Sequence, residues 1–565
     1  MKRSSLRPAF GRQACVECGT SFEISDDDRR LLRDFDVPDP KSCPECRLMR
    51  RMIERDARRL YWRISDATGK RILSQYHADH PFPVFEPEEW WSDRFDGLAF
   101  GRDIDFSQPF FPQFLALKNV VPHQARFLIQ DTIENSDYVN CAGFLKNCYL
   151  SFEVDYNEDC YYSNRVYHCK NMVDCSNCYD SEICYESVDC TGCHAVFSSQ
   201  DCQNCSGSFF LKNCIGCRDC IGCINQRQKQ YMIFNKRLSR EEFAKRKAEL
   251  HLDTTDGMRA FHKKAEEFFV SQPQRYAQTE RNENCTGDHL YDSKNAFQCL
   301  DCKDLEDCRY CAKVAMGVKS CMDYNSWGDK AERLYQCSAC GNNAFNLKFC
   351  TTCATNNSDL EYCDSCVGCR NCFGCVGLKK KQYCILNKEY SEEEYGKRRE
   401  KLIAHMRKTD EWGEYFPKDV CPFAFNETIA MEYFPISKQE AIRRGYKWRD
   451  EVDEPLNVKK VIPAGELPQS IEEIPDDVLN WAVTSEKTKR PFRIIKQELE
   501  FYRAHHLPLP HLHPEERHED RLKRRPPRRL WKRPCSECGR EIESTFAPKR
   551  AERVLCEECY LKEVY

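Results

Sequence analysis

Residues 214–223 read CIGCRDCIGC, and they close a series of cysteines whose spacings are all multiples of three. This period matches neither an α-helix, with about 3.6 residues per turn, nor a strand, which alternates every two residues. Units such as YLSFEVDYNEDC (149–160) and HAVFSSQDCQNC (194–205) are 12 residues long. They predict a narrow solenoid of stacked coils, because one coil cannot bury its inner face alone. The series comprises Cys148, Cys160, Cys169, Cys175, Cys178, Cys184, Cys190, Cys193, Cys202, Cys205, Cys214, Cys217, Cys220 and Cys223.

A second cysteine-rich block repeats the first at an offset of 152 residues, where residues 366–375 read CVGCRNCFGC. This block runs from Cys285 to Cys384 and contains slips in the three-residue phase. Each block precedes a charged amphipathic segment that begins with a capping box, in which a serine is followed three residues later by a glutamate. The capping pairs are Ser239 with Glu242 and Ser391 with Glu394, and a shorter helix is expected from Ser437 with Glu440.

The two ends of the chain each carry a pair of Cys-x-x-Cys motifs. One motif presents two thiolates to an ion, and two motifs complete a tetrahedron, so both ends predict a zinc ribbon. Four cysteine ligands leave no open position for water or substrate, which indicates structural rather than catalytic zinc. The expected ligands are Cys15, Cys18, Cys43 and Cys46 at one end and Cys535, Cys538, Cys556 and Cys559 at the other.

A second duplication relates these two ends at an offset of 470 residues, and it predicts vacated metal sites. Each end then derives from a module with two zinc sites, of which the N-terminal copy keeps the first and the C-terminal copy keeps the second. The residues at the vacated positions are mostly hydroxyl or carboxylate residues, which do not hold zinc comparably. Only His513 and Glu516 remain as a candidate ligand pair. The vacated positions are Ser65, Thr68, Glu86 and Glu89, and Ser485, Thr488, His513 and Glu516.

Composition narrows the class of protein. The chain has 565 residues and a net charge of −4, so a uniformly basic nucleic-acid binder is excluded. Its first residues have no apolar core after the basic ones, and no apolar run is long enough to span a membrane. We therefore expect a cytoplasmic protein whose 40 cysteines stay reduced rather than forming disulfides.

The central cysteines allow three interpretations. Thiols that fill a narrow core as small hydrophobic groups are the favoured one. Additional zinc between coils is the second, and an iron–sulfur cluster is the third, although the last spacing of the 214–223 run and the following Ile224 depart from the ferredoxin pattern. The residues that carry the additional-metal interpretation are Cys214, Cys217, Cys220, Cys223, Cys366, Cys369, Cys372 and Cys375.

Two arginine-rich segments, 47–63 and 517–533, follow the outer cysteine motifs and carry net charges of +5 and +7. Arg47, Arg51, Arg55 and Arg59 recur every four residues, which places them on one helix face. Arginine binds phosphate bidentately and nearby aromatic rings can stack on bases, so these segments predict contact with nucleic acid. A solvated charged face is the alternative. The full set is Arg47, Arg51, Arg55, Arg58, Arg59, Arg63, Arg517, Arg521, Arg525, Arg528, Arg529 and Arg533.

The stretch CVECGTSFEISDDDRRLLRDFDVPDPKSCPECRLMRR (15–51) resembles a zinc-ribbon domain with the pattern C-x-x-C-G-x-x-F followed by C-P-x-C-R. The whole chain is similar to cysteine-rich tandem zinc-ribbon proteins of candidate-phyla-radiation bacteria, often labelled CaiB/BaiF family. The features that carry this likeness include WWSDRFDGLAFGRDIDF and PFAFNETIAMEYFP. The resemblance implies terminal ribbons around Cys-x-x-Cys repeats, and it implies no established function.

The expected fold is mainly β with short helices, in which terminal zinc ribbons flank two β-helix-like solenoid blocks. The aromatic-rich segment is expected to pack irregularly over the first block, and residues 450–480 to form a linker. The expected segments are the first ribbon with its basic helix (11–63), the aromatic-rich segment (64–133), solenoid block 1 (134–238), a helical segment (239–283), solenoid block 2 (284–390), a helix and linker (391–483) and the C-terminal ribbon (484–565).

No catalytic motif of the GxxxxGK[ST], HExxH or GxSxG type is present. The sequence therefore favours a non-catalytic, zinc-binding protein that contacts RNA, DNA or a ribonucleoprotein. A protein-interaction scaffold that binds partners through the solenoid is one alternative, and a thiol or iron–sulfur redox protein is another. No membrane partner is expected.

Overall fold

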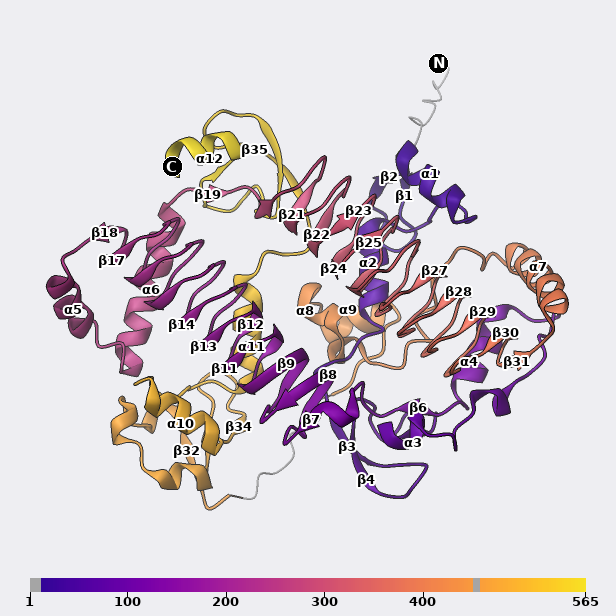
Figure 1. Ribbon diagram of the computed structural model, residues 1–565, viewed down its shortest axis with the longest axis horizontal. Coiled ribbons are helices and arrows are strands. Elements are labelled where there is room, and N and C mark those ends of the chain that lie inside the picture. Colours follow the sequence, from indigo (N-terminus) through magenta and orange to yellow (C-terminus); the bar gives the residue numbers. More distant parts are fainter. Residues whose placement is uncertain (1–11, 451–457, 565) are drawn as a thin grey trace.

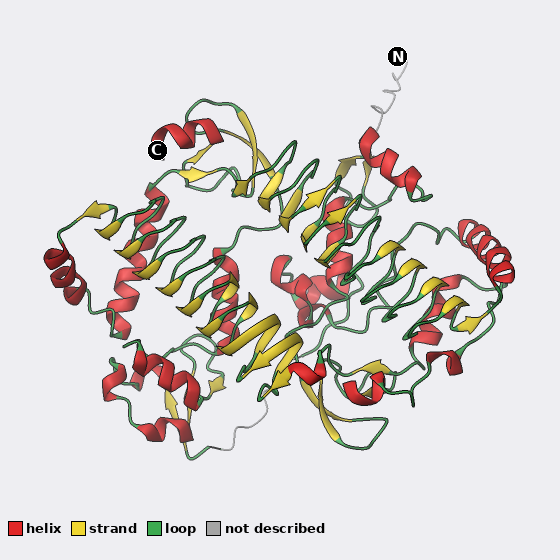
Figure 2. Ribbon diagram, viewed as in Figure 1, coloured by secondary structure: helices red, strands yellow, loops and turns green. Residues whose placement is uncertain are grey.

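The computed structural model describes residues 12–450 and 458–564. It confirms the predicted fold class, with strands stacked into two solenoids and short helices around them (Figures 1 and 2). The first residue of the expected N-terminal segment, residue 11, lies outside the described residues, as do 451–457 and Tyr565. Within the described ranges, no helix has the length and apolar character needed to cross a membrane.

The first solenoid is a stack of parallel strands, closed at its end by one antiparallel strand, and paired residues of successive parallel coils are 12 positions apart. Met172 of β11 pairs with Cys184 of β13, and Cys184 pairs with Val196 of β14. The strands are β7 (Ile133–Glu134), β8 (Val139–Lys146), β9 (Ser151–Tyr161), β10 (Asn164–Tyr167), β11 (Lys170–Val173), β12 (Ser176–Tyr179), β13 (Glu182–Tyr185), β14 (His194–Phe197), β15 (Ser206–Phe209), β16 (Arg218–Ile221), β17 (Gln230–Ile233) and β18 (Lys236–Arg237).

The second solenoid is built in the same way, and its phase slips are coils of 13 residues. Leu290 pairs with Cys302 at a separation of 12, whereas Val314 pairs with Trp327 at 13. Its strands are β20 (Thr279–Glu280), β21 (Gly287–Tyr291), β22 (Cys299–Lys303), β23 (Leu305–Glu306), β24 (Ala312–Ala315), β25 (Val318–Lys319), β26 (Asn325–Gly328), β27 (Phe345–Lys348), β28 (Ser358–Glu361), β29 (Arg370–Phe373), β30 (Gln382–Ile385) and β31 (Lys388–Glu389).

Every third residue from Cys141 to Asp201 has a positive φ, and this repeated turn explains the period of three. Asn and Asp tolerate this conformation better than other residues with a side chain, and they occupy many of the corners. The N–H groups at the corners donate to the preceding coil, as in Asp180 to the Tyr167 carbonyl (3.1 Å) and Asp189 to the Ser176 carbonyl (3.0 Å). The ladder of backbone hydrogen bonds thus compensates a turn that would be strained in isolation.

Four ribbon-like modules surround the solenoids, two at each end of the chain. Their elements recur at the predicted offset of 470. The first and second ribbons contain β1 (Arg12–Ala14), β2 (Ser21–Glu23), α1 (Asp26–Asp34) and α2 (Pro44–Met52), then β3 (Tyr61–Ile64), β4 (Arg71–Ser74), β5 (Val84–Phe85) and α3 (Pro87–Trp91). The third and fourth contain β33 (Trp481–Thr484), β34 (Pro491–Phe492), α10 (Lys496–Ala504) and α11 (Pro514–Arg524), then β35 (Trp531–Pro534), β36 (Glu541–Ser544), β37 (Val554–Leu555) and α12 (Glu557–Val564).

The remaining elements connect or cover these modules. In Figure 1 the two solenoids run across the view as two rows of short strands, with α8 and α9 between them. Ser239, Ser391 and Ser437 cap α5, α7 and α9 as predicted, each accepting from the backbone N–H of the glutamate three residues later. These elements are α4 (Phe110–Lys118), β6 (His123–Gln124), α5 (Arg240–Glu249), α6 (Thr255–Ser271), β19 (Gln274–Arg275), α7 (Glu392–Lys408), α8 (Ile429–Tyr433), α9 (Lys438–Arg443) and β32 (Lys460–Pro463).

Each solenoid is covered by a segment from the opposite end of the chain, and this corrects the expected packing of the aromatic-rich segment on the first solenoid. Phe110 and Phe114 of α4 lie in one core with Phe373 and Leu386 of the second solenoid, not with the first. The first solenoid is covered instead by residues 458–509 from the far end of the chain. Part of the expected linker is therefore folded, since Val478 is fully buried in that core. The aromatic content of the segment indicates that it packs against an apolar surface. It does not indicate which of the two similar solenoids supplies that surface.

The solenoid interior is packed tightly enough that side-chain volume determines stability. Cys202 is fully buried in the stack, whereas the adjacent Gln203 is only partly buried. We predict that Cys202→Leu destabilises the protein by about 1–3 kcal/mol, the usual cost of overpacking a filled core. The measurement is the thermal midpoint, with Gln203→Leu as the matched control that adds apolar volume outside the coil. Equal midpoints for the two variants would contradict a closely packed interior.

Candidate metal centres

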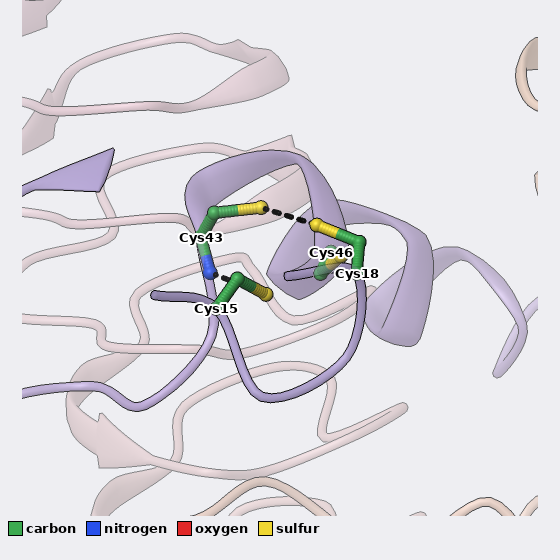
Figure 3. A group of neighbouring side chains, drawn as sticks. All are labelled: Cys15, Cys18, Cys43 and Cys46. Carbon is green, nitrogen blue, oxygen red and sulfur yellow. Dashed lines mark hydrogen bonds between the residues drawn. The ribbon is translucent and has the colours of Figure 1, made fainter. Parts of the chain in front are cut away.

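The N-terminal cysteines converge as predicted (Figure 3). Cys15 and Cys18 lie in the turn after β1, while Cys43 precedes α2 and Cys46 lies in its first turn. Their sulfur atoms all lie within 4.8 Å of one another, with 3.8 Å between Cys18 Sγ and Cys43 Sγ. Gly19 closes the turn with a φ of 73°, and the backbone N–H of Cys43 donates to Cys15 Sγ at 3.3 Å. This is the geometry of two knuckles that face one ion.

The C-terminal cysteines form an equivalent group. The four sulfurs again lie within 4.8 Å of one another, and Cys538 Sγ and Cys556 Sγ are 3.8 Å apart. The N–H of Cys556 donates to Cys535 Sγ at 3.2 Å. The two groups share one burial pattern and one type of N–H to sulfur hydrogen bond. Since four sulfurs converge in each group, the chain can bind a metal ion at each end, and both groups are compatible with zinc ribbons.

The surroundings of each group favour a thiolate. The hydrogen bond from Cys46 is the largest influence on Cys43 and lowers the pKa of that thiol to about 5. Burial opposes ionisation of Cys535, but N–H groups of Cys538 and Cys556 outweigh it and lower the pKa to about 6. A thiolate is the form that binds a metal ion, so each group offers at least one ligand that is ionised near neutral pH.

The vacated knuckle of the second ribbon keeps its shape without metal ligands. Ser65 donates its hydroxyl to Glu86, and Thr68 donates to the other oxygen of that carboxylate at 2.6 Å. The N–H of Gly69 donates to the Ser65 carbonyl at 3.0 Å, matching the 2.9 Å bond from Gly19 to Cys15. Hydroxyl–carboxylate hydrogen bonds thus replace the ion that would join the two halves of the ribbon.

The third ribbon shows the same replacement. The Ser485 hydroxyl donates to Glu516, and hydrogen bonds from Ser485 and Thr488 outweigh burial and lower the pKa of Glu516. His513 precedes α11 and accepts the N–H of Glu515 at 3.2 Å. His513 and Glu516 therefore act in the cap of α11, and their hydrogen bonds give no support to the predicted residual ligand pair.

The central cysteines follow the core-filling interpretation. Within residues 12–450 and 458–564, they form no group of three or more ligand atoms close enough to share an ion. Their thiols instead donate to backbone carbonyls of the same coil and of the next one. Cys214 Sγ lies 3.4 Å from the Lys212 oxygen and 3.5 Å from the Cys223 oxygen. The other residues of the additional-metal prediction are equally enclosed, namely Cys217, Cys220, Cys223, Cys366, Cys369, Cys372 and Cys375.

The predicted phosphate-binding arginines are largely buried inside the molecule. Helix α2 ends at Met52, so Arg55 and Arg59 lie beyond the expected helix face. Most of the guanidinium groups bind carboxylates of the protein itself, and Arg533 donates to backbone carbonyls of Phe546 and Ala547. The buried members of the set are Arg47, Arg51, Arg63, Arg517, Arg521, Arg525, Arg528 and Arg533; Arg55, Arg58 and Arg59 are partly buried, and Arg529 is exposed.

Helix α11 docks on the first solenoid through Asp174. The fully buried carboxylate of Asp174 accepts from Arg517 and, at 2.7 Å, from Arg521. Tyr162, one coil earlier, lies under the Arg517 guanidinium at 4.7 Å and donates its hydroxyl to Glu498 at 3.0 Å. The Asp174 carboxylate therefore joins two arginines of α11 to the first solenoid.

Helix α2 docks on the second solenoid through an equivalent cluster. Asp323 lies at the position that corresponds to Asp174 once the 13-residue coils are counted, and it binds Arg47 and faces Arg51 at 3.6 Å. Tyr310 corresponds to Tyr162. The Arg47 guanidinium lies 5.7 Å from the Tyr310 ring, and the Tyr310 hydroxyl donates to Asp28 at 3.0 Å. The third arginine of each helix segment crosses to the other solenoid, Arg55 to Glu153 and Arg525 to Asp301 at 2.8 Å. We call these two clusters the arginine staples.

Asp174 and Asp323 are the residues that sequence reasoning missed. Both duplications were visible, and applying them together, with the slips counted, would have placed one buried aspartate opposite each arginine helix. The arginine spacing was the correct signal, but a row of arginines on a helix face does not show whether the acceptor is a phosphate or a carboxylate of the same chain.

Comparisons with known proteins add little to this geometry. No family model and no curated protein matches the chain. Among solved structures, a "putative acetyltransferase from Desulfovibrio desulfuricans G20" is 10% identical, and the match covers 45% of this chain and 72% of that one. Its TM-score is 0.12, so the likeness carries no argument about fold or function.

The terminal metal site and the first ribbon should form one folding unit. We predict that Cys18→Ser removes one metal ion per chain and unfolds residues 12–52 locally, because binding and ribbon folding are one equilibrium. Elemental analysis and hydrogen exchange of that segment measure the two effects. Ser21→Ala serves as the control, since this nearby residue is no ligand. A variant that keeps its full metal content and its protection would contradict the assignment of Cys18 as a ligand.

Proposed function

We propose that the protein is a non-catalytic, zinc-dependent binding scaffold in which the terminal ribbons lock two solenoids side by side. The observation that carries this proposal is the pair of arginine staples, since each staple joins a metal-bearing end of the chain to both solenoids. Four closely spaced thiolates suit zinc or iron, and the closed four-cysteine arrangement of two Cys-x-x-Cys knuckles favours zinc.

The surface of the first solenoid supports a protein partner. Phe144, Tyr156 and His168 stack on successive coils, with ring centroids 4.4 and 4.7 Å apart. Phe144 and Tyr156 remain 42% and 51% exposed. Because the ring faces cover one another, the ladder presents ring edges rather than open faces, which suits side-chain contact better than base stacking.

Removing the metal tests the scaffold. We predict at least two zinc ions per chain by elemental analysis, one for each terminal group of cysteines, and a chelator should expose 12–52 and 531–564 to hydrogen exchange while the solenoid interiors stay protected. The physical reason is that thiolate–zinc bonds fold the ribbons, whereas the coils depend on packing. Iron in place of zinc, or a chelated chain with unchanged exchange, would refute the proposal.

Nucleic-acid contact is the second candidate, and a specific corner of the fourth ribbon supports it. The Arg529 side chain is 54% exposed and lies 5.5 Å from the Trp531 ring, which combines a phosphate ligand with a stacking surface. Its ion pair with Glu45 spans 3.5 Å at the surface and is weak.

Salt dependence tests this candidate. We predict that single-stranded RNA binds at low salt, that affinity falls steeply between about 50 and 200 mM salt, and that Trp531→Ala weakens binding by about 1–3 kcal/mol. Fluorescence anisotropy measures both effects, with Trp91→Ala as the control because Trp91 is a 47% exposed tryptophan on α3 of the second ribbon, away from the position that corresponds to Trp531. Salt-independent binding, or equal loss in both variants, would exclude this corner.

A further inference from the structure

A third group of metal-ligating side chains lies where the two solenoids face each other. Asp189 and Asp201 occupy equivalent corners of successive coils in the first solenoid, 12 residues apart. His289 is a corner residue of β21 in the second solenoid. One ligand atom from each of the three lies within 4.8 Å of the others, although the three come from different coils and two different blocks.

The imidazole of His289 is oriented as in a metal site. Its Nδ1 lies 3.2 Å from an oxygen of Asp288, and its Nε2 lies 3.0 Å from Asp201. Asp288 is itself fixed, because it accepts the N–H of Gln278 at 2.8 Å and the hydroxyl of Thr545. A carboxylate that holds one ring nitrogen of a histidine is the usual outer partner of a metal ligand, since it fixes the tautomer and turns the other nitrogen toward the ion.

The charge balance also favours a cation. Four carboxylates, those of Asp189, Asp201, Asp288 and Asp301, lie around this point with little exposure, and Arg525 and Arg528 bring two positive charges. A divalent ion with a neutral histidine balances these six charged groups; of the further cations that line the adjoining cavity, Arg275 and Arg550 are paired with Glu557 and Glu552. Buried carboxylates need paired charge or a metal ion, because isolated charges are costly away from water.

There is room for an ion and its waters. A cavity of about 60 Å³ is lined by Asp201, Asp288 and His289, with Gln200 and Gln278 in its wall. The cationic residues Lys212, Arg275, Arg524 and Arg550 also line it. This exceeds the space that one water molecule needs, and polar groups that can hold water surround it.

We propose that Asp189, Asp201 and His289 bind one divalent transition-metal ion that cross-links the two solenoids. Carboxylate and imidazole ligands suit Mn²⁺ or Zn²⁺, unlike the all-thiolate terminal groups. The site occurs once, because the residues at the corresponding corners of the other solenoid are Cys141, Ala339 and Thr352. The ion therefore joins the two blocks at a point that the duplication does not repeat. This role does not depend on which partner the scaffold binds.

The test uses Mn²⁺ as the probe on the full chain with its terminal sites loaded with zinc, because thiolate groups disfavour manganese. Electron paramagnetic resonance of free Mn²⁺ should show one bound ion per chain. Asp201→Asn and His289→Gln should weaken binding by about 10–100-fold, and Asp288→Asn should do so to a similar degree through the orientation of His289. Asp180→Asn, an exposed corner of the same solenoid, is the matched control and should bind as the parent does.

Two further measurements make each outcome decisive. Every variant should keep the two zinc ions of its terminal groups, which shows that the ribbons are folded and separates this site from the terminal ones. No bound Mn²⁺ and no third zinc in the parent protein would overturn the proposal. Unchanged binding in Asp201→Asn and His289→Gln would overturn it equally, and it would leave His289 as an imidazolium hydrogen-bonded by Asp201 and Asp288.

Discussion

The whole arrangement depends on buried pairs of arginine and aspartate. A guanidinium and a carboxylate lose a large hydration energy on burial, and only close, well-directed hydrogen bonds compensate for it. Asp174 and Asp323 are fully enclosed, so a displaced α2 or α11 would leave an uncompensated charge in the interior. This penalty selects one register of each helix on its solenoid. It also explains why α2 and α11 each lie between the two solenoids, since the arginines of each helix segment bind carboxylates of both.

Cysteine serves two separate purposes in this chain. In the interior of the solenoids it is a small residue that fits where a coil of 12 residues leaves little room, and its thiol donates to carbonyls that face inward. At the termini it can bind a metal ion, because two turns bring four sulfurs together in each ribbon. In the second ribbon the same knuckle turn forms without cysteines, and hydrogen bonds among Ser65, Thr68 and Glu86 join its two halves. Both uses require reduced thiols.

Much of the fold was predictable because the deciding signals are local or periodic. The three-residue spacing reports the repeated corner, the Cys-x-x-Cys pairs report the knuckles, and Ser239 and Ser391 report helix starts. The partners of Phe110 and Arg521 were not predictable in this way. Two similar solenoids offer similar surfaces, and the choice between them depends on single residues far along the chain, such as Asp174. Nor does a row of arginines reveal whether phosphate or carboxylate receives it.

A double-mutant cycle on Arg521 and Asp174 tests the staples most directly. Hydrogen exchange of α11 gives its free energy of opening in Arg521→Met, in Asp174→Asn and in the combined variant. The account predicts that the two changes are coupled by about 2 kcal/mol or more, within the upper range for residues in one buried network. The pair Arg47 and Asp323 should behave in the same way in α2. Effects that add to within about 0.5 kcal/mol would show that the staples do not hold the solenoids.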